Sequence, residues 1–301
     1  MENIKFETAI EEWLKFKKLS SKESTYYRYV YIVNEYVLPN FKNVDLEYFV
    51  TYDFNEYIET LLKNLKPVSV RNVFVIFKSI LRFAQRKYGY VFNFDFLSIP
   101  QVHTDELRVL SNREKGKLER YCQKNNTLRD IGILICLNTG LRIGEICALK
   151  WDCIDLDKKC IRVTKTMQRI YNKAENTSEV KIDTPKTQNS IRSIPMSTKM
   201  YDILKPLKKK YTGNCYFLTG SANNYVEPRN YQNMFKRCLK SCNIKDFHFH
   251  QLRHTFATNC IEVGMDTKSL SEILGHANVK VTLDKYVHSS YNSKKKFLEK
   301  L

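Results

Sequence analysis

The sequence contains little glycine and proline, nine and seven residues out of 301, which excludes a collagen-like or low-complexity chain. It also contains no apolar run near the roughly 18 residues that a membrane-spanning helix needs. The opening residues, MENIKFETAIEEW, lack the apolar segment of a secretory signal. These absences predict a globular protein of the cytoplasm, with a nuclear location as the alternative. Its length predicts about two domains, at roughly 150 residues each.

No Cys-x-x-Cys pair occurs among the nine cysteines, which all lie between Cys122 and Cys260. Cys238 and Cys242 are four residues apart, but the histidines that follow them do not complete a zinc-binding spacing. An odd number of cysteines in an unsecreted chain is typical of reduced and mostly buried thiols. We therefore expect neither a metal site nor disulfides.

Acidic residues are too few to balance the basic ones, and the net charge is +18. The first hundred residues carry only +2 of this excess, so residues 101–301 carry +16. A field of this sign attracts polyanions, among which nucleic acid is the commonest. A membrane surface is a weaker alternative, because no basic amphipathic helix stands out. A basic surface that serves solubility alone is the third interpretation.

The first hundred residues have helical periodicity. A helix is predicted from the apolar spacing of Phe6, Ile10, Trp13, Leu14 and Phe16. A second helix would open at Ser24 and close at Pro39, and a third would run from Asp53 through Leu65. Pro67 would start a fourth helix, ending near Gly89.

The segment from Leu61 to Asn93 contains seven basic residues and no acidic one. This pattern favours phosphate contact along one helix face, with a solvated helix surface as the alternative. The candidate DNA-binding residues are Lys63, Lys66, Arg71, Lys78, Arg82, Arg86 and Lys87.

A second domain begins near residue 105. Residues 93–105 have no clear period and contain Pro100, so they are interpreted as a linker between residues 1–92 and 106–301. A capping box at Ser111–Glu114 predicts a helix start. Cys160–Met167 and Ile191–Pro195 predict a small antiparallel sheet, and the chain from Pro228 onward is again helical. The fold class is therefore α+β, mostly helical, with a small antiparallel sheet.

The first candidate site lies in TGLRIGEICALKWDCIDL. Arg142 follows a glycine turn, and Glu145 comes one helical turn later. A guanidinium at the mouth of a helix, held by a carboxylate at i+3, suits bidentate phosphate binding. An ordinary surface ion pair is the alternative.

The second candidate is Lys186 in TPKTQNSIRSIPM, on a polar turn between two strand-like runs. A lysine on such a turn can reach into a site and deliver a proton, although most loop lysines are only solvated. The third is HFHQLRHTFATNCIEVG, in which His250 and Arg253 share a helix face. This pair could bind a phosphate and move a proton, unless His250 is structural.

The fourth candidate lies in LSEILGHANVKVTLDKYVH. His276 follows Gly275, which ends a helix, and Tyr286 comes ten residues later. A tyrosine with a free pKa of about 10 is a poor nucleophile, unless neighbouring cations stabilise the phenolate. Among nineteen tyrosines, an interface role is the alternative.

In this order, the arginine, lysine, His-x-x-Arg, Gly-His and tyrosine motifs resemble the tyrosine recombinase (phage integrase) family. The resemblance covers residues 106–290, through LRIGEICALKWDCIDL, TPKTQNSIRSIPM, HQLRHTFAT and LGHANVKVTLDKYVH. STYYRYVYIVNEYVLPNF and PVSVRNVFVIFKSILRFA resemble more loosely the family's helical core-binding domain. Tyr291, His248 and His254 do not fit the motif frames, so they are not candidates.

The resemblance implies a role for each matching residue. Arg142 and Arg253 would clamp the scissile phosphate of double-stranded DNA, with Glu145 supporting Arg142. Tyr286 would attack to form a 3′-phosphotyrosine, while Lys186 protonates the departing 5′ oxygen. His250 would assist proton movement, and His276 would hydrogen-bond a phosphate oxygen.

The family exchanges strands in a synapsed homo-tetramer through a Holliday junction, without a metal or nucleotide cofactor. The tail SYNSKKKFLEKL would pack on a neighbouring protomer through Phe297, Leu298 and Leu301, with a frayed basic tail as the alternative. The chain has little room before residue 6 for the extra arm-binding domain of many integrases, which favours a simple recombinase. DNA relaxation like that of a type IB topoisomerase and a catalytically idle DNA-binding regulator remain as alternatives.

Overall fold

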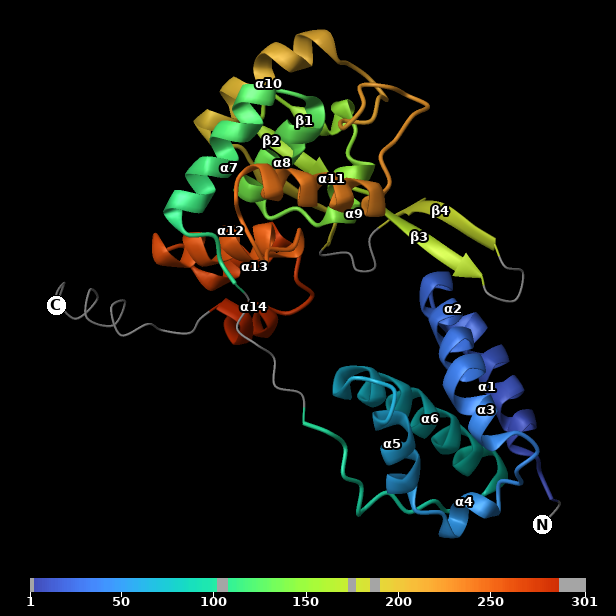
Figure 1. The fold of residues 1–301 in the computed structure, drawn as a ribbon. Coiled ribbons are helices and arrows are strands. Elements are labelled where there is room, and N and C mark those ends of the chain that lie inside the picture. Colours follow the sequence, from blue (N-terminus) through green and yellow to red (C-terminus); the bar gives the residue numbers. More distant parts are fainter. Residues whose placement is uncertain (1–2, 102–107, 173–176, 185–189, 287–301) are drawn as a thin grey trace, which may run out of the picture. The chain divides into compact units, whose positions relative to one another are not determined.

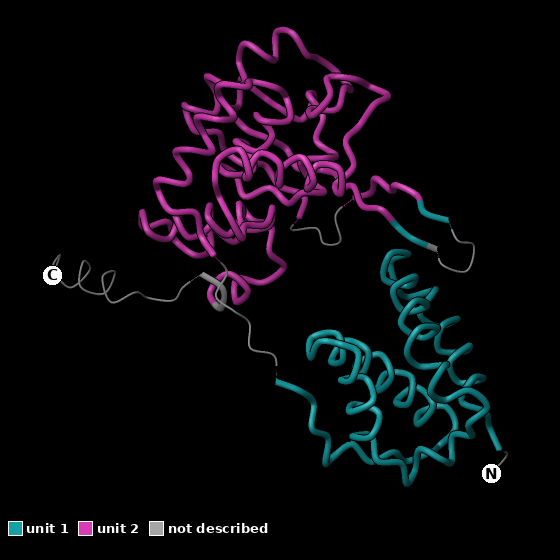
Figure 2. Tube along the Cα trace, viewed as in Figure 1, with its two compact units in different colours: residues 1–105, 170–178 teal, residues 106–169, 179–301 magenta. Residues whose placement is uncertain are grey.

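The computed structural model describes residues 3–101, 108–172, 177–184 and 190–286, with the backbone alone at Asn172 and 284–286. The chain divides into two compact units (Figure 2). Unit 1 comprises residues 1–105 and 170–178, and unit 2 comprises residues 106–169 and 179–301. No helix in the described ranges is long and apolar enough to cross a membrane.

Unit 1 is a helical bundle (Figure 1). Its core contains a cluster of aromatic rings, in which Phe77 lies against Phe6, Phe41 and Phe49 with centroid separations of 5.1–5.8 Å. Phe77 packs edge-to-face with Phe6 and Phe49 and stacks on Phe41, and both arrangements stabilise a core beyond the area that they bury. The helices are α1 (Phe6–Ser20), α2 (Glu23–Ile32), the π-helical η1 (Val33–Val37), α3 (Leu38–Phe41), α4 (Tyr48–Thr51), α5 (Phe54–Leu62) and α6 (Pro67–Tyr88).

Local signals set the start of α5 and both ends of α6 as predicted, whereas α5 ends at Leu62 and not at the predicted Leu65. The carboxylate of Asp53 accepts a hydrogen bond from the backbone N–H of Asn55 at the start of α5. Pro67 occupies the first turn of α6, and Gly89 ends that helix with φ +77°. The prediction that Pro39 closes the second helix is wrong. The π-helical turn η1 precedes it, so Pro39 stands in the first turn of α3.

Four of the predicted DNA-binding residues share one face of α6. Arg71, Lys78, Arg82 and Arg86 recur at spacings of seven and four residues, which place them along one side of a helix. Lys87 lies about 100° further round and forms an ion pair with Glu12 of α1, so it is not part of that face. Lys63 and Lys66 are exposed in the turn before α6.

The segment after α6 stays attached to unit 1 through Ser98. Phe94 and Leu97 pack against the aromatic core. Asn55 donates to the carbonyl of Phe96 and accepts from the backbone N–H of Ser98. The ammonium of Lys78 lies 4.4 Å from the centre of the Phe94 ring.

Unit 2 is built around α8, a helix that is buried on nearly all sides. Its helices are α7 (Asn112–Asn125), α8 (Leu128–Thr139), α9 (Ile143–Ala148), the 3₁₀ turn η2 (Trp151–Cys153), α10 (Thr198–Lys210), α11 (Pro228–Ser241), α12 (His250–Glu262), α13 (Thr267–Leu274) and α14 (Val279–Tyr286). The predicted capping box at Ser111–Glu114 opens α7. Figure 1 shows α12, α13 and α14 grouped together, and the three helices contact one another.

Two small sheets occur in the described residues. β1 (Ile154–Asp155), β2 (Cys160–Val163) and β5 (Arg192–Pro195) pair antiparallel in the order β1-β2-β5, with Ile161 opposite both Ile154 and Ile194. β3 (Thr166–Asn172) and β4 (Thr177–Asp183) form a separate two-stranded sheet. The α+β, mostly helical fold class is confirmed. The predicted run Cys160–Met167 is instead divided between β2 and β3.

All nine cysteines are free, and six of them are buried, as the sequence predicts. Burial raises the pKa of the Cys147 thiol and, to about 11, that of the Cys260 thiol. These thiols are therefore protonated and act as small apolar core residues.

Candidate active site

Arg142 and Glu145 form the predicted pair at the start of α9. Gly140, with φ +67°, ends α8 and turns the chain so that Arg142 precedes the first residue of α9. Glu145 accepts hydrogen bonds from the backbone N–H of Arg142 at 2.9 Å and from its Nη1 at 2.8 Å. The Arg142 side chain is 36% exposed, whereas that of Glu145 is only 2% exposed. Glu145 thus fixes a guanidinium that faces solvent.

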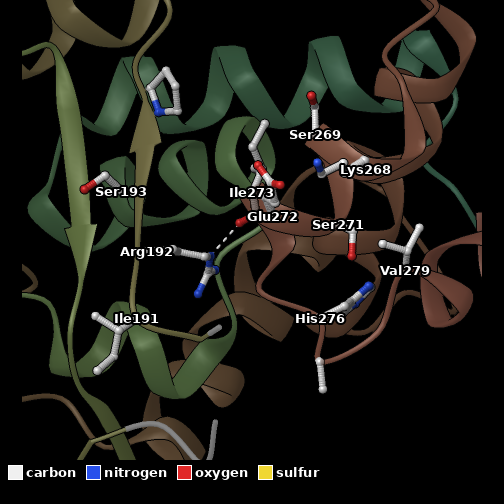
Figure 3. A pocket seen from close by; sticks show the side chains of 12 residues that line it. Ile191, Arg192, Ser193, Lys268, Ser269, Ser271, Glu272, Ile273, His276 and Val279 are labelled. Carbon is white, nitrogen blue, oxygen red and sulfur yellow. Dashed lines mark hydrogen bonds between the residues drawn. The ribbon is translucent and has the colours of Figure 1, made fainter. Parts of the chain in front are cut away.

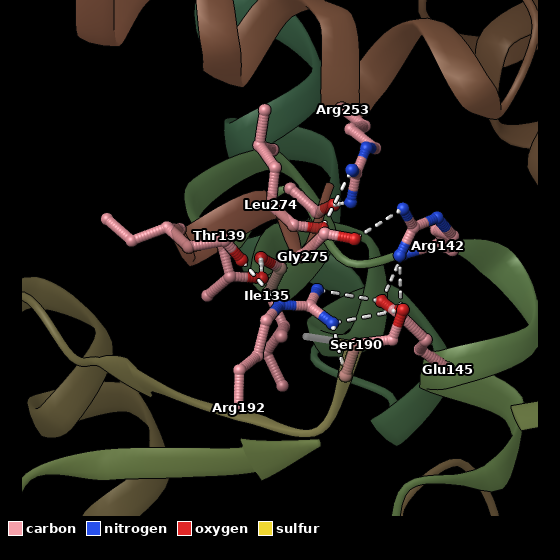
Figure 4. Close-up of polar contacts among 11 residues, drawn as sticks. Ile135, Thr139, Arg142, Glu145, Ser190, Arg192, Arg253, Leu274 and Gly275 are labelled. Carbon is pink, nitrogen blue, oxygen red and sulfur yellow. Dashed lines mark hydrogen bonds and ion pairs between the residues drawn. The ribbon is translucent and has the colours of Figure 1, made fainter. Parts of the chain in front are cut away.

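A second arginine binds the same carboxylate, which the sequence did not indicate. Arg192 of β5 donates from Nη1 and Nη2 to the two carboxylate oxygens of Glu145, at 3.0 and 2.9 Å (Figure 4). Both side chains are buried. The only available signal was an arginine within a strand-like run, which gives no partner.

The two arginines determine the charge state of Glu145. Burial by itself raises the pKa of this carboxyl group. The hydrogen bonds and charge of Arg192, followed by the charge and backbone N–H of Arg142, outweigh burial and hold the pKa below its ordinary value. Glu145 is therefore ionised at neutral pH.

Arg253 lies one helical turn after His250 on α12 and is 2% exposed. Its Nη1 donates to the carbonyl of Gly140 at 2.9 Å, and its Nη2 donates to the carbonyl of Leu274 at 2.8 Å. The guanidinium is thus attached to the C-terminal ends of both α8 and α13. His250 itself is exposed at the first residue of α12.

Three consecutive carbonyls at the end of α13 each accept a hydrogen bond from a different arginine. Arg192 Nε donates to Ile273 at 2.5 Å (Figure 3). Arg253 donates to Leu274 at 2.8 Å and Arg142 Nη2 to Gly275 at 3.1 Å (Figure 4). The last carbonyls of a helix lack intrahelical partners and carry its partial negative charge. The end of α13 therefore aligns three cations, contributed by α9, α12 and β5.

His276 follows this row of carbonyls directly. Its Nδ1 lies 2.8 Å from Thr282 Oγ1 of α14, and this contact fixes the orientation of the imidazole. The structure therefore brings together Arg142, Glu145, Arg253 and His276, all predicted from the sequence.

A cleft of about 660 Å³ lies between β5 and α13 beside this group (Figure 3). Arg192, Lys268 and His276 are among its lining residues. Within the ranges that the structure describes, no three His, Cys, Asp or Glu side chains are arranged as metal ligands.

Two predicted catalytic residues and the three predicted contact residues of the C-terminal tail are described incompletely or not at all. Lys186 lies outside the described residues, as do Phe297, Leu298 and Leu301 of the C-terminal tail and the excluded Tyr291. Tyr286 is the last residue of α14, and its side chain is not described. Among the excluded histidines, His254 is buried on α12 and His248 is exposed.

Comparison with models of known protein families identifies the family to which this chain belongs. The family model described as "Phage integrase family" matches residues 108–293, more than half of the chain. The chain belongs to the phage integrase family. A second model, "Phage integrase, N-terminal SAM-like domain", matches residues 5–62. The family predicted from the motifs is thereby confirmed.

Relatives of this phage integrase family member include recombinases and integrases of bacteria. It is 30% identical over 203 residues to a "Tyrosine recombinase XerC-like" of Caldanaerobacter subterraneus, covering 61% of this chain and 51% of the relative. It is 24% identical to the "ICEBs1 integrase" of Bacillus subtilis, covering 99% of this chain and 83% of the relative. The chain thus spans about half the length of the first of these relatives.

A solved structure establishes that the fold is shared. The Tn1549 transposon integrase, described in complex with a circular intermediate DNA, superposes with a TM-score of 0.79. The match covers 99% of this chain and 100% of that one, at 23% identity. The chain thus shares the fold of this integrase along nearly its whole length.

Proposed function

We propose that the protein is a site-specific DNA recombinase, which cuts and rejoins double-stranded DNA through a 3′-phosphotyrosine. The observation that carries this proposal is the alignment of Arg142 and Arg253 on the carbonyls of Gly275 and Leu274, immediately before His276. Two positioned guanidinium groups beside an imidazole form an anion site suited to a phosphodiester. Relatives named as recombinases and integrases support the same reaction class.

In the proposed reaction, Tyr286 is the nucleophile. Its phenol oxygen attacks the scissile phosphorus as the bond from phosphorus to the 5′ oxygen breaks. Lys186 donates a proton to the departing 5′ oxygen, and His250 takes part in moving the phenol proton. The reverse attack by a 5′ hydroxyl reseals the strand and releases the tyrosine, so the ester conserves the energy of the broken bond.

The cations of the site stabilise the charge that develops on the phosphoryl oxygens. Arg142 and Arg253 clamp the phosphate, and His276 hydrogen-bonds one of its oxygens. Because their contacts hold these groups in place beforehand, little reorganisation is needed when charge develops. The reaction on this account proceeds without a metal or nucleotide cofactor.

The packing of α12, α13 and α14 supports the assignment of Tyr286 as the nucleophile. α14 contacts both α12, which carries Arg253, and α13, whose end aligns the arginines. Thr282, one helical turn before Tyr286, bonds to His276. The helix that carries the nucleophile is thus attached to the phosphate site.

The proposal assigns DNA binding to both parts of the chain. Residues 1–92 form a helical core-binding domain, with phosphate contacts from Lys63, Lys66 and the basic face of α6. Residues 93–105 are the linker, whose first part packs on this domain through Phe94 and Leu97, and residues 106–301 carry catalysis. Four protomers act on two synapsed sites in the cytoplasm, with the C-terminal tail packed on a neighbour.

A paired assay distinguishes recombination from relaxation. The protein is incubated with supercoiled plasmids that carry one or two copies of the DNA flanking its gene. Exchange between two copies supports the proposal. Relaxation without exchange indicates chemistry like that of a type IB topoisomerase, and binding without either reaction indicates a catalytically idle regulator.

A further inference from the structure

Arg192 connects three segments that meet at the candidate active site. Besides its two bonds to Glu145, its Nε donates to the carbonyl of Ile273 at the end of α13. Its Nη1 also lies 3.1 Å from the carbonyl of Ser190. The side chain is only 6% exposed, and all three of its nitrogens have acceptors within the protein. Arg192 is therefore placed to act on other residues rather than on DNA.

We propose that Arg192 is a positioning residue for strand cleavage, which offsets the charge of Glu145 so that the positive charge of Arg142 is not cancelled and acts on the scissile phosphate. This inference rests on the proposed function and assigns a new residue to the same site. It concerns the charge and place of Arg142, and Arg192 itself has no contact with the reacting atoms.

The charge argument follows from the sharing of one carboxylate. Glu145 carries one negative charge between two guanidinium groups, so the three side chains together carry +1. Without Arg192, Glu145 would pair with Arg142 alone, and that pair would be neutral. The carboxylate is 2% exposed, and water screens such a charge poorly in a protein interior.

Geometry adds to the charge effect. Arg192 bonds to Ile273, Arg253 to Leu274 and Arg142 to Gly275. Loss of the Arg192 side chain therefore removes the first of three hydrogen bonds that hold the end of α13. A displacement of about 1 Å at a catalytic group can slow a reaction on the order of 100-fold. Arg142 and His276 both depend on the position of this helix end.

The test compares the rate of covalent adduct formation on a nicked DNA substrate for wild type and Arg192→Met. We expect the variant to bind DNA as wild type does and to form adduct about 10- to 100-fold more slowly. Arg237→Met is the matched control, because it removes the same charge from an exposed position of α11. A rate for Arg192→Met within about threefold of the control overturns the inference.

A double variant separates the charge effect from general structural damage. In Arg192→Met combined with Glu145→Gln, Arg142 no longer faces an unbalanced carboxylate. Replacing both partners of a buried ion pair is also less harmful than removing one. We therefore expect the double variant to cleave faster than Arg192→Met alone. A double variant no faster than Arg192→Met contradicts the proposed path through Glu145.

A further variant covers the case in which Arg192→Met does not fold. Arg192→Lys keeps the charge but offers a single ammonium in place of the planar fork. We expect it to fold, to bind DNA and to form adduct at least about 5-fold more slowly than wild type. A wild-type rate shows that the charge at residue 192 is sufficient and overturns the contribution of its planar fork to positioning. If wild-type protein itself forms no adduct, the proposed function fails instead.

Discussion

Arg253 donates to the carbonyl of Leu274 at 2.8 Å and thereby attaches the N-terminal part of α12 to the end of α13. Its other terminal nitrogen holds the carbonyl of Gly140 at the end of α8. One buried guanidinium thus connects the ends of two helices. A planar fork with donors in fixed directions is suited to this arrangement.

Arg253→Lys tests that geometry with the charge retained. A lysine ammonium on a flexible stem cannot reproduce two fork contacts, so the phosphate site loses a positioned donor. We expect DNA binding close to that of wild type and adduct formation slower by about 100- to 1,000-fold. Time courses on denaturing gels measure the rate, and gel shifts measure binding.

Arg162→Lys serves as the control for this change, because Arg162 is an exposed residue of β2 outside the candidate site. The control should cleave as wild type does. Wild-type cleavage by Arg253→Lys would show that the fork is dispensable.

Glu145→Gln should remove a pH-dependent part of the stability. The pKa of Glu145 is lowered in the folded protein from its ordinary value of 4.5. Its ionised form therefore stabilises the fold above pH 4.5, and this contribution is lost as the pH falls through the lowered pKa. At neutral pH, Glu145→Gln leaves Arg192 buried without its carboxylate, at a cost of about 3 to 5 kcal/mol.

Urea unfolding of both proteins at several pH values measures this difference. The gap between wild type and Glu145→Gln should be largest at neutral pH and should narrow below pH 4.5. A gap independent of pH would mean that Glu145 contributes through packing alone.

The salt dependence of DNA binding tests the proposal that both domains bind the duplex, together forming a clamp around it. If on the order of ten phosphates are neutralised, log K should fall with log salt concentration with a slope of roughly −9. Fluorescence anisotropy at a series of salt concentrations gives the slope. A slope shallower than about −3 would leave too few phosphate contacts for a clamp.

The basic face of α6 can be tested one residue at a time. Arg82→Ala should weaken DNA binding and reduce the magnitude of the salt slope by about 1, because Arg82 is exposed on that face. Lys87→Ala is the internal comparison, since Lys87 pairs with Glu12 of α1. Equal effects of Arg82→Ala and Lys87→Ala on the salt slope would mean that the phosphate contacts are not confined to the basic face of α6.

Local chemistry explains which parts of the fold could be predicted from the sequence. Asp53, Pro67 and Gly89 act within a few residues of themselves, so the bounds that they set follow from composition. The prediction that Pro39 closes the second helix was wrong because the effect of this proline depends on the π-helical turn before it. No local residue type is diagnostic of such a turn. The division of Cys160–Met167 likewise depends on which strands pair.

The candidate site shows the same distinction. Arg142 and Glu145 are three residues apart, so their contact could be read from helical spacing. Arg192 reaches Glu145 across 47 residues and Ile273 across 81. No periodicity reports on contacts at that separation, and only the folded chain shows that α13 ends where three arginines meet.

The most direct test of the central claim measures how much covalent protein–DNA adduct wild-type protein and Tyr286→Phe each form with the same nicked DNA substrate. Wild type should accumulate a protein–DNA adduct that survives denaturation. After cleavage, the nick lets the short DNA fragment that carries the free 5′ hydroxyl dissociate, so the strand cannot be resealed. Tyr286→Phe should bind the same DNA with equal affinity and form no adduct. Adduct formed by Tyr286→Phe at the wild-type rate would contradict the account, because another side chain would then be the nucleophile.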